Sequence, residues 1–249
     1  SMNSLLDDNK VLTLANGERV GLTKQVLFVF EVDQVSNTTP ATVSRCGMIY
    51  MHDKLIGWWP FARTWIASRR DPAEAAHLRQ LFDAHVENVL AFKNESCEDF
   101  LAVPEIHLVR SLTRMYDALV DRLAPLIEAM PDFALSKTII EMYFLFSLVW
   151  SIGGGLTASS RPKFSKYIQA LPDQLRPFPR HDTVYDYYVD TEKRRWSPWQ
   201  DHLRGGAEPF PSHSSQLGHM FPTPDTLRYS YLGGILVENR TNVILVGQP

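Results

Sequence analysis

Apolar and polar positions recur with the period of a helix through the middle of the chain. Between about residues 55 and 171, apolar side chains return every three to four positions, which is the spacing of an amphipathic helix. Helix-start signals precede these runs at Asp71-Pro72, Pro104 and Ser136. We therefore expect a mainly helical region here, beginning with a Trp-rich helix at residues 57–66.

One predicted helix is apolar almost all round. The run from Ile139 to Leu156 contains Glu141 near one end and closes with consecutive glycines, Gly153–Gly155. Such a segment is either a membrane span or the central helix of a large core. Because charged sequence lies on both sides, we favour a buried core helix.

Shorter apolar runs outside the helical region predict strands. Val26–Val32 is β-branched and aromatic without alternation, as in a strand buried on both faces of a parallel sheet. Met48–Met51 and Asn242–Val246 predict further strands. Asn16-Gly17 separates two strand-like runs, which is a strong signal for a β-hairpin.

A second hairpin is predicted after the helical region. Val184–Val189 forms one aromatic strand, Trp196–Trp199 the returning strand, and residues 190–195 the turn between them. The Gly-, Pro- and Ser-rich residues 204–218 predict a connector, and Thr226–Val237 has the apolar spacing of a helix.

Composition narrows the functional classes. The chain has 249 residues, 45% of them hydrophobic and 21% charged, which is ordinary for a globular protein with a real core. A net charge of −3 argues against a dedicated nucleic-acid binder. Two cysteines cannot form a metal-binding framework, and Asp83, His85 and Glu87 are spread too far round their helix to form one metal-binding face. We expect no metal site.

Residues 40–47 carry the most specific candidate chemistry. Pro40 is favoured at the first position of a helix and Gly47 is a natural stop, so Arg45 would lie at the end of a short helix. There its guanidinium can point away from its own domain and stabilise a transferring phosphoryl group bound by a neighbour. The alternative is a surface arginine in a solvated cap.

Several blocks of sequence resemble a known family when taken in order. They are Leu6-Asp7-Asp8-Asn9-Lys10, Leu14–Arg19, Phe30-Glu31-Val32, Ala41–Met48, Phe146–Gly154, Thr183–Asp190 and Pro222–Tyr231. Together they resemble the second AAA+ module of a dynein heavy chain, the ATP-driven microtubule motor. The resemblance covers nearly the whole chain.

The resemblance implies an α+β, mainly α fold with three parts. Residues 3–54 would be the C-terminal part of an AAA+ α/β P-loop NTPase subdomain, with a β-hairpin insert and an arginine-finger helix. Residues 55–203 would be the helical AAA+ lid subdomain with a late β-hairpin. Residues 204–249 would be a connector and the first helix and strand of the third module.

The resemblance also implies roles for residues in the first two parts. Arg45 would be an arginine finger acting in trans on ATP held by the first module. Glu31 and Asp33 lie near the C-terminal end of the predicted strand, close to the place of an AAA+ sensor, where a neutral polar residue is usual. The alternative for this acidic pair is a role as fixing side chains or as solvated loop carboxylates. Arg110 or Arg114 would reach a phosphate as the second sensor does, and the alternative for this pair is a solvated basic edge.

In the third part, the implied residues belong to the next nucleotide site. Pro222, Thr223 and Arg228 would line its adenine side, and Gly247 would be the first glycine of its phosphate-binding loop. A complete G-x-x-x-x-G-K-[ST] pattern occurs nowhere in the chain, so we expect this chain alone to hydrolyse no ATP.

For the intact motor, the resemblance implies ATP or ADP with Mg²⁺ as cofactor, none of it bound tightly by this chain alone. Implied partners are the neighbouring AAA+ modules, the mechanical linker, the microtubule and dynein intermediate and light chains, with no nucleic acid and no membrane. The expected location is the cytoplasm and cytoskeleton, with a ciliary or flagellar axoneme favoured.

Two other functions remain as alternatives. The dominance of helix would also fit a scaffold or adaptor domain with no nucleotide role. A hydrolase built from scattered Ser, His and Asp residues lacks a nucleophile-elbow motif.

Overall fold

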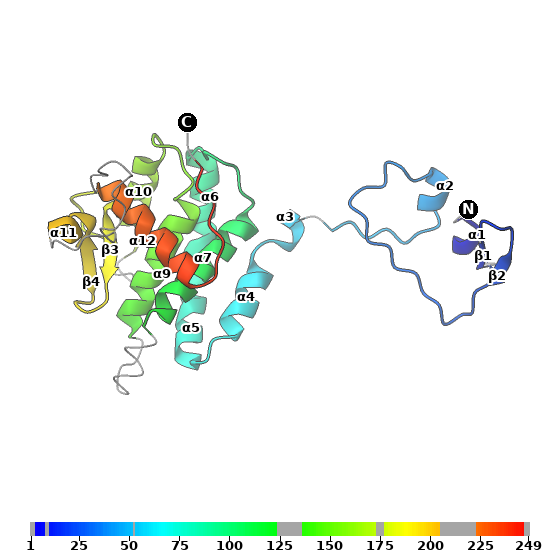
Figure 1. Cartoon of the computed structure of the whole chain (residues 1–249), viewed down its shortest axis with the longest axis horizontal. Helices are drawn as coiled ribbons and strands as arrows, with labels where there is room; N and C mark the ends of the chain where they lie inside the picture. The colour runs from blue at the N-terminus through cyan, green and yellow to red at the C-terminus, as the bar shows by residue number, and fades with distance from the viewer. Residues whose placement is uncertain are drawn as a thin grey trace, which may run out of the picture. The chain divides into compact units, whose positions relative to one another are not determined.

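The computed structural model describes residues 3–7, 10–51, 53–123, 136–172, 177–204 and 223–246. The chain divides into two compact units, Ser1–Leu55 and Ile56–Pro249 (Figure 1), and each is described by itself. The helix α3 (Asp53–Ile56) spans the boundary between them.

In its described residues, the first unit contains two short helices and one hairpin, apart from α3 at its boundary. They are α1 (Asn3–Leu6), β1 (Val11–Thr13), β2 (Arg19–Gly21) and α2 (Pro40–Val43). The strands pair antiparallel with Leu12 opposite Val20, which confirms the hairpin predicted around Asn16-Gly17. Gly17 has φ of 87°, a left-handed conformation that glycine adopts without steric cost, and this explains the glycine in the turn.

The predicted strands Val26–Val32 and Met48–Met51 are wrong as elements of this structure. Both segments are irregular, and their apolar side chains face solvent, with Leu27 84% and Val29 94% exposed. A buried strand needs hydrogen-bonded neighbours on both sides. In the part of the chain that the structure describes, the only strands are those of the two hairpins, so these segments have no sheet to join.

The second unit is built from helices. They are α4 (Trp59–Ala67), α5 (Pro72–Leu81), the π-helical turn η1 (Phe82–Val86), α6 (Glu87–Ser96), α7 (Glu105–Asp121), α9 (Lys137–Ile152) and α10 (Arg161–Gln169). Asp71 caps α5 by accepting from Ala73 N at 2.8 Å, and Ser136 caps α9 by accepting from Ile139 N at 3.4 Å. Both predicted helix starts are confirmed. The π-helical turn η1 was not predicted, because helical periodicity runs through it without a break.

The helix α9 is the centre of the core, as predicted. It packs most extensively against α7, and nearly all of its side chains from Ile139 onward are buried. Phe144 lies against Phe82 with ring centroids 5.4 Å apart. None of the helices described has the length and apolar character needed to cross a membrane.

A second hairpin follows the helices. The elements are the 3₁₀ turn η2 (Val184–Asp186), β3 (Tyr187–Asp190), β4 (Arg195–Pro198) and α11 (Trp199–Arg204). The strands pair antiparallel with Val189 opposite Trp196, so this predicted hairpin is confirmed. The first half of the predicted strand is instead η2, because Thr183 and Asp186 form a reciprocal capping box that bends the backbone.

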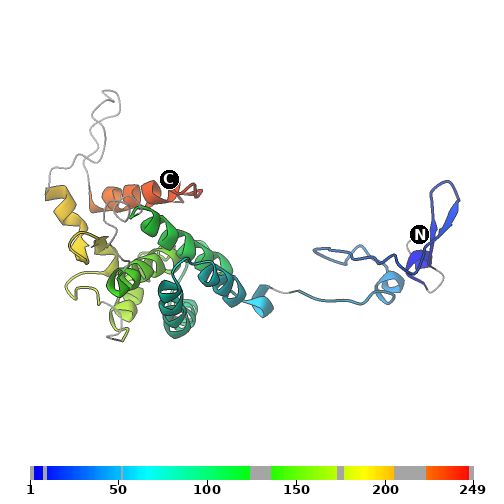
Figure 2. The ribbon, with the colours of Figure 1, turned by 90° about the horizontal axis from the view of Figure 1, so that it is seen from below.

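The helix α12 (Pro224–Glu238) packs onto this helical unit, alongside α7 and α11 (Figures 1 and 2). Its Tyr231 ring lies 5.2 Å from Trp199 and 6.2 Å from Phe146, and its Ile235 is 1% exposed. The predicted helix is therefore confirmed. The predicted strand Asn242–Val246 is wrong here: it is irregular, with Ile244 86% exposed.

Candidate functional site

The candidate site in the first unit is organised by α2. Pro40 occupies its first turn, and the Thr39 hydroxyl accepts from Thr42 N at 3.3 Å as the N-cap. The helix ends at Val43, so the backbone turns immediately before Arg45. The start and stop signals in the sequence therefore place Arg45 just after a short, capped helix, as predicted.

Arg45 is held at two of its three nitrogens. Its Nε donates to a carboxylate oxygen of Asp7, and its Nη1 donates to the carbonyl oxygen of Ala41 at 2.6 Å. The side chains of Arg45 and Asp7 remain 33% and 41% exposed, so this ion pair lies at the surface of the unit and not in a core. Among the residues described, Nη2 has no partner.

A second contact ties α2 to the start of the chain. The Thr42 hydroxyl donates to the side-chain oxygen of Asn3 at 2.6 Å, across 39 positions in sequence. Leu5, between Asn3 and Asp7, is 7% exposed. The turn that carries Arg45 is thus attached to α1 both through its helix and through its guanidinium.

Glu31 and Asp33 were predicted at a sensor position. The structure places both in the irregular, exposed segment that follows residue 26. Among the described residues neither forms an ion pair. They belong to the same unit as Arg45, and both side chains are exposed.

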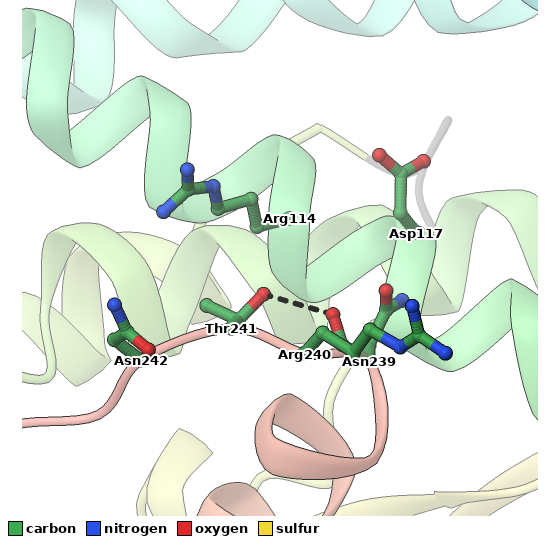
Figure 3. Close-up of a pocket in the computed structure, with 6 residues that line it drawn as sticks. All are labelled: Arg114, Asp117, Asn239, Arg240, Thr241 and Asn242. Carbon is green, nitrogen blue, oxygen red and sulfur yellow. Dashed lines mark hydrogen bonds between the residues drawn. The ribbon is translucent and has the colours of Figure 1, made fainter.

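Arg110 and Arg114 lie one turn apart on the exposed face of α7. Arg114 lines a shallow depression of about 300 Å³ together with Asp117 and residues 239–242. Figure 3 shows the side chains of Arg114 and Arg240 extending in opposite directions, so they do not converge on one ligand. Asp117 is already engaged by Arg69 at 2.7 Å and Trp65 Nε1 at 2.9 Å, while burial raises its pKa.

Thr223 and Arg228 are engaged within the helical unit. Thr223 caps α12 by accepting from Thr226 N at 3.2 Å. Arg228 is only 13% exposed, and its guanidinium lies 2.7 Å from Asp225 and 3.7 Å from Asp186. Arg228 therefore fastens α12 to η2. Pro222 and Gly247 lie outside the described residues.

Clusters of His, Cys, Asp and Glu side chains would indicate a metal site. In the described ranges, no three His, Cys, Asp or Glu side chains form a group that could hold a metal ion. The expectation that this chain has no metal site stays a prediction, because Mg²⁺ in nucleotide sites is held largely by water, phosphate and one or two carboxylates.

Comparison with known proteins agrees with the helical architecture. The family model of the dynein heavy chain AAA lid domain matches residues 78–201, from within α5 into α11. Over 99% of its length the chain is 37% identical to human dynein axonemal heavy chain 2 and 33% identical to the dynein-1-beta heavy chain of the flagellar inner arm I1 complex of Chlamydomonas reinhardtii. It is also 32% identical, again over 99% of the chain, to the ciliary dynein beta chain of Tripneustes gratilla.

The chain belongs to the dynein heavy chain family. It spans only 5–6% of the length of these curated relatives, which are axonemal, flagellar or ciliary heavy chains by name. In this dynein segment the lid match coincides with the bundle around α9, so the predicted mixed α+β fold with a helical lid is confirmed.

Sequence reasoning did not identify Asp7 as part of the candidate site. Asp7 belongs to one of the blocks that carry the dynein resemblance, yet nothing in the sequence links it to Arg45, which is 38 positions away. Only the folded unit shows that the carboxylate and the guanidinium meet.

Proposed function

We propose that this segment completes an ATP site held by the preceding AAA+ module of a dynein heavy chain, with Arg45 as the trans-acting arginine finger. The observation that carries the proposal is the geometry of Arg45: it follows a capped helix, it is one-third exposed, and one guanidinium nitrogen has no partner among the described residues. A guanidinium presented in this way can stabilise the charge on a transferring γ-phosphoryl group.

The helical unit has a second role in this proposal. It would act as the lid over nucleotide held by its own module and transmit the nucleotide state as a rigid-body movement. The match to the AAA lid family and the single core around α9 support this role. The exposed Arg110 and Arg114 would be the lid residues available to meet a phosphate.

The cofactor in this proposal is ATP or ADP with Mg²⁺, held by parts of the motor other than the residues described here. The partners would be the adjoining modules, the mechanical linker, the microtubule and the intermediate and light chains. Since its relatives are named as axonemal, flagellar and ciliary chains, we place this motor in the cytoskeleton of a cilium or flagellum.

The experiment is a substitution in the intact heavy chain. Arg45→Ala should lower kcat for ATP by on the order of 10³–10⁵ at the site it serves, because finger arginines contribute about that much. Arg45→Lys should recover little, since an ammonium lacks the planar fork of a guanidinium. Arg195→Ala, which removes an exposed arginine on β4, is the matched control and should leave kcat unchanged.

Microtubule-stimulated ATPase activity and gliding velocity are the measurements. Arg45→Ala with both near the wild-type value would exclude the finger role. It would favour a lid and scaffold segment without a direct contact to nucleotide.

A further inference from the structure

The guanidinium of Arg45 is restrained on two sides. Asp7 accepts from Nε, and the Ala41 carbonyl accepts from Nη1 at 2.6 Å. The two acceptors come from different places in the chain, one just after α1 and the other inside α2. Within the described residues, Nη2 is the nitrogen left to donate elsewhere.

The two hydrogen bonds restrict the conformations that the Arg45 side chain can adopt. A free arginine samples many rotamers, and ordering it at the moment of reaction costs conformational entropy. When Nε and Nη1 are already bonded, the plane of the guanidinium is fixed before a phosphate arrives. Preorganised donors stabilise developing charge without reorganisation at the moment of reaction.

We propose that Asp7 is the positioning residue of Arg45, holding the guanidinium so that Nη2 faces the transferring phosphoryl group of the neighbouring module. This inference rests on the proposed finger role of Arg45. Asp7 would not touch the nucleotide; it would act through the orientation of Arg45 alone.

The contacts around Asp7 fix its position within the first unit. The Thr42 hydroxyl donates to Asn3 at 2.6 Å, so α2 is fastened to the same helix whose end carries Asp7. Leu5 is buried at 7% exposure and fixes that helix in the unit. The position of Asp7 is therefore fixed by the contact between α1 and α2 and by the burial of Leu5.

An opposite role for the same ion pair makes a different prediction. If Asp7 instead competed with phosphate for Arg45, the ion pair would inhibit ATP hydrolysis. Removing the carboxylate would then free the guanidinium and raise the ATPase rate. Positioning predicts a fall in the rate when the carboxylate is removed.

The test is a double-mutant cycle in the intact heavy chain, with kcat and KM for ATP as readouts. Asp7→Ala should lower kcat by roughly 10- to 100-fold, because misplacement of a reacting group by about 1 Å costs up to that much. KM should change little. Asp7→Asn keeps an oxygen that accepts from Nε and should lie between Asp7→Ala and wild type. In an Arg45→Ala background, Asp7→Ala should cause no further fall.

Glu95→Gln is the control, because Glu95 is an exposed carboxylate at the end of α6, outside the proposed site. If Asp7→Ala fails to fold, Asp7→Leu carries the test, since it is close to Asp in size and has no oxygen to accept from Nε.

The outcomes separate the two proposals. Wild-type kcat in Arg45→Ala would overturn the finger role itself. A lowered kcat in Arg45→Ala with an unchanged or raised kcat in the variant that lacks the Asp7 acceptor, Asp7→Ala or Asp7→Leu, would overturn only the positioning role. Equal losses from Asp7→Ala with and without Arg45 would show that Asp7 acts through another part of the fold, and would also overturn it.

Discussion

At the residue scale, the proposed function depends on the place of Arg45 at the surface of the first unit, just after α2. Its place after a short helix could be predicted from Pro40 and Gly47, because these residues mark helix ends by their backbone preferences. Its partner Asp7 could not be predicted, since ion pairs between distant residues depend on tertiary structure. The same limit applies to the contact of Arg228 with Asp186, which joins α12 to η2.

Buried tyrosines give the helical unit a predictable alkaline limit. Burial, as the main cause, raises the pKa of Tyr143 from 10.0 to about 12, and its hydroxyl lies 2.9 Å from that of Thr191. Above pH 10 the unfolded chain loses this proton while the folded chain keeps it. The stabilisation is therefore complete below pH 10 and is lost as the pH rises through about 12.

We expect the free energy of unfolding to fall over this interval, with Tyr143 contributing roughly 2–3 kcal/mol. Urea denaturation at a series of alkaline pH values measures it, and Tyr143→Phe should show a shallower decline. An equal decline in the wild type and the variant would show that Tyr143 does not contribute.

At the element scale, the predictions succeeded where local chemistry decides the structure. Asp71 and Ser136 start helices because their side chains cap backbone N–H groups, and such caps are visible in sequence. The turn η2 was missed because its capping box lies inside a run of strand-forming aromatic residues. The π-helical turn η1 was also missed, because it does not visibly change the spacing of the apolar residues.

The glycines after α9 offer a matched pair of variants. A Cβ on Gly154 would lie 2.2 Å from the carbonyl oxygen of Trp150, whereas a Cβ on Gly155 would meet nothing within 4 Å. Gly154→Ala should therefore destabilise the helical unit by about 1–3 kcal/mol, the usual range for overpacking. Gly155→Ala should be nearly neutral. Thermal unfolding compares the two, and similar melting temperatures would contradict this close approach.

Two residues of α12, one buried and one exposed, test whether this helix packs into the core of the helical unit. Ile235 is 1% exposed and Val237 is 64% exposed. Ile235→Ala should cost about 2–5 kcal/mol, and Val237→Ala should cost less than about 0.5 kcal/mol. Chemical denaturation measures both. Equal small losses would mean that α12 is not part of the core of the helical unit.

At the scale of the whole molecule, the chain separates into two units that differ in how many apolar side chains they bury. The core cluster lies in the second unit, and Leu5 is the buried apolar residue that the described part of the first unit contributes. Sequence periodicity predicted the helical unit because its helices bury one another. It failed for residues 26–32, 48–51 and 242–246, because a strand forms only where partner strands are present.

Hydrogen exchange distinguishes these regions. Amides of residues 26–35 and 48–51 should exchange close to the intrinsic rate, whereas those of α9 should be among the most protected. Mass spectrometry after timed labelling measures both. Strong protection within residues 26–32 would show that this segment pairs as a strand after all.

The proposed finger role means that Arg45 stabilises a transition state formed in the neighbouring module. Its most direct test is the affinity of the intact heavy chain for ADP–aluminium fluoride, an analogue of that state, compared with its affinity for ADP. Arg45→Ala should weaken binding of the analogue by on the order of 10³-fold and change ADP binding by less than about twofold, because a finger acts mainly on the transition state. Equal affinities for the analogue in wild type and Arg45→Ala would contradict the account.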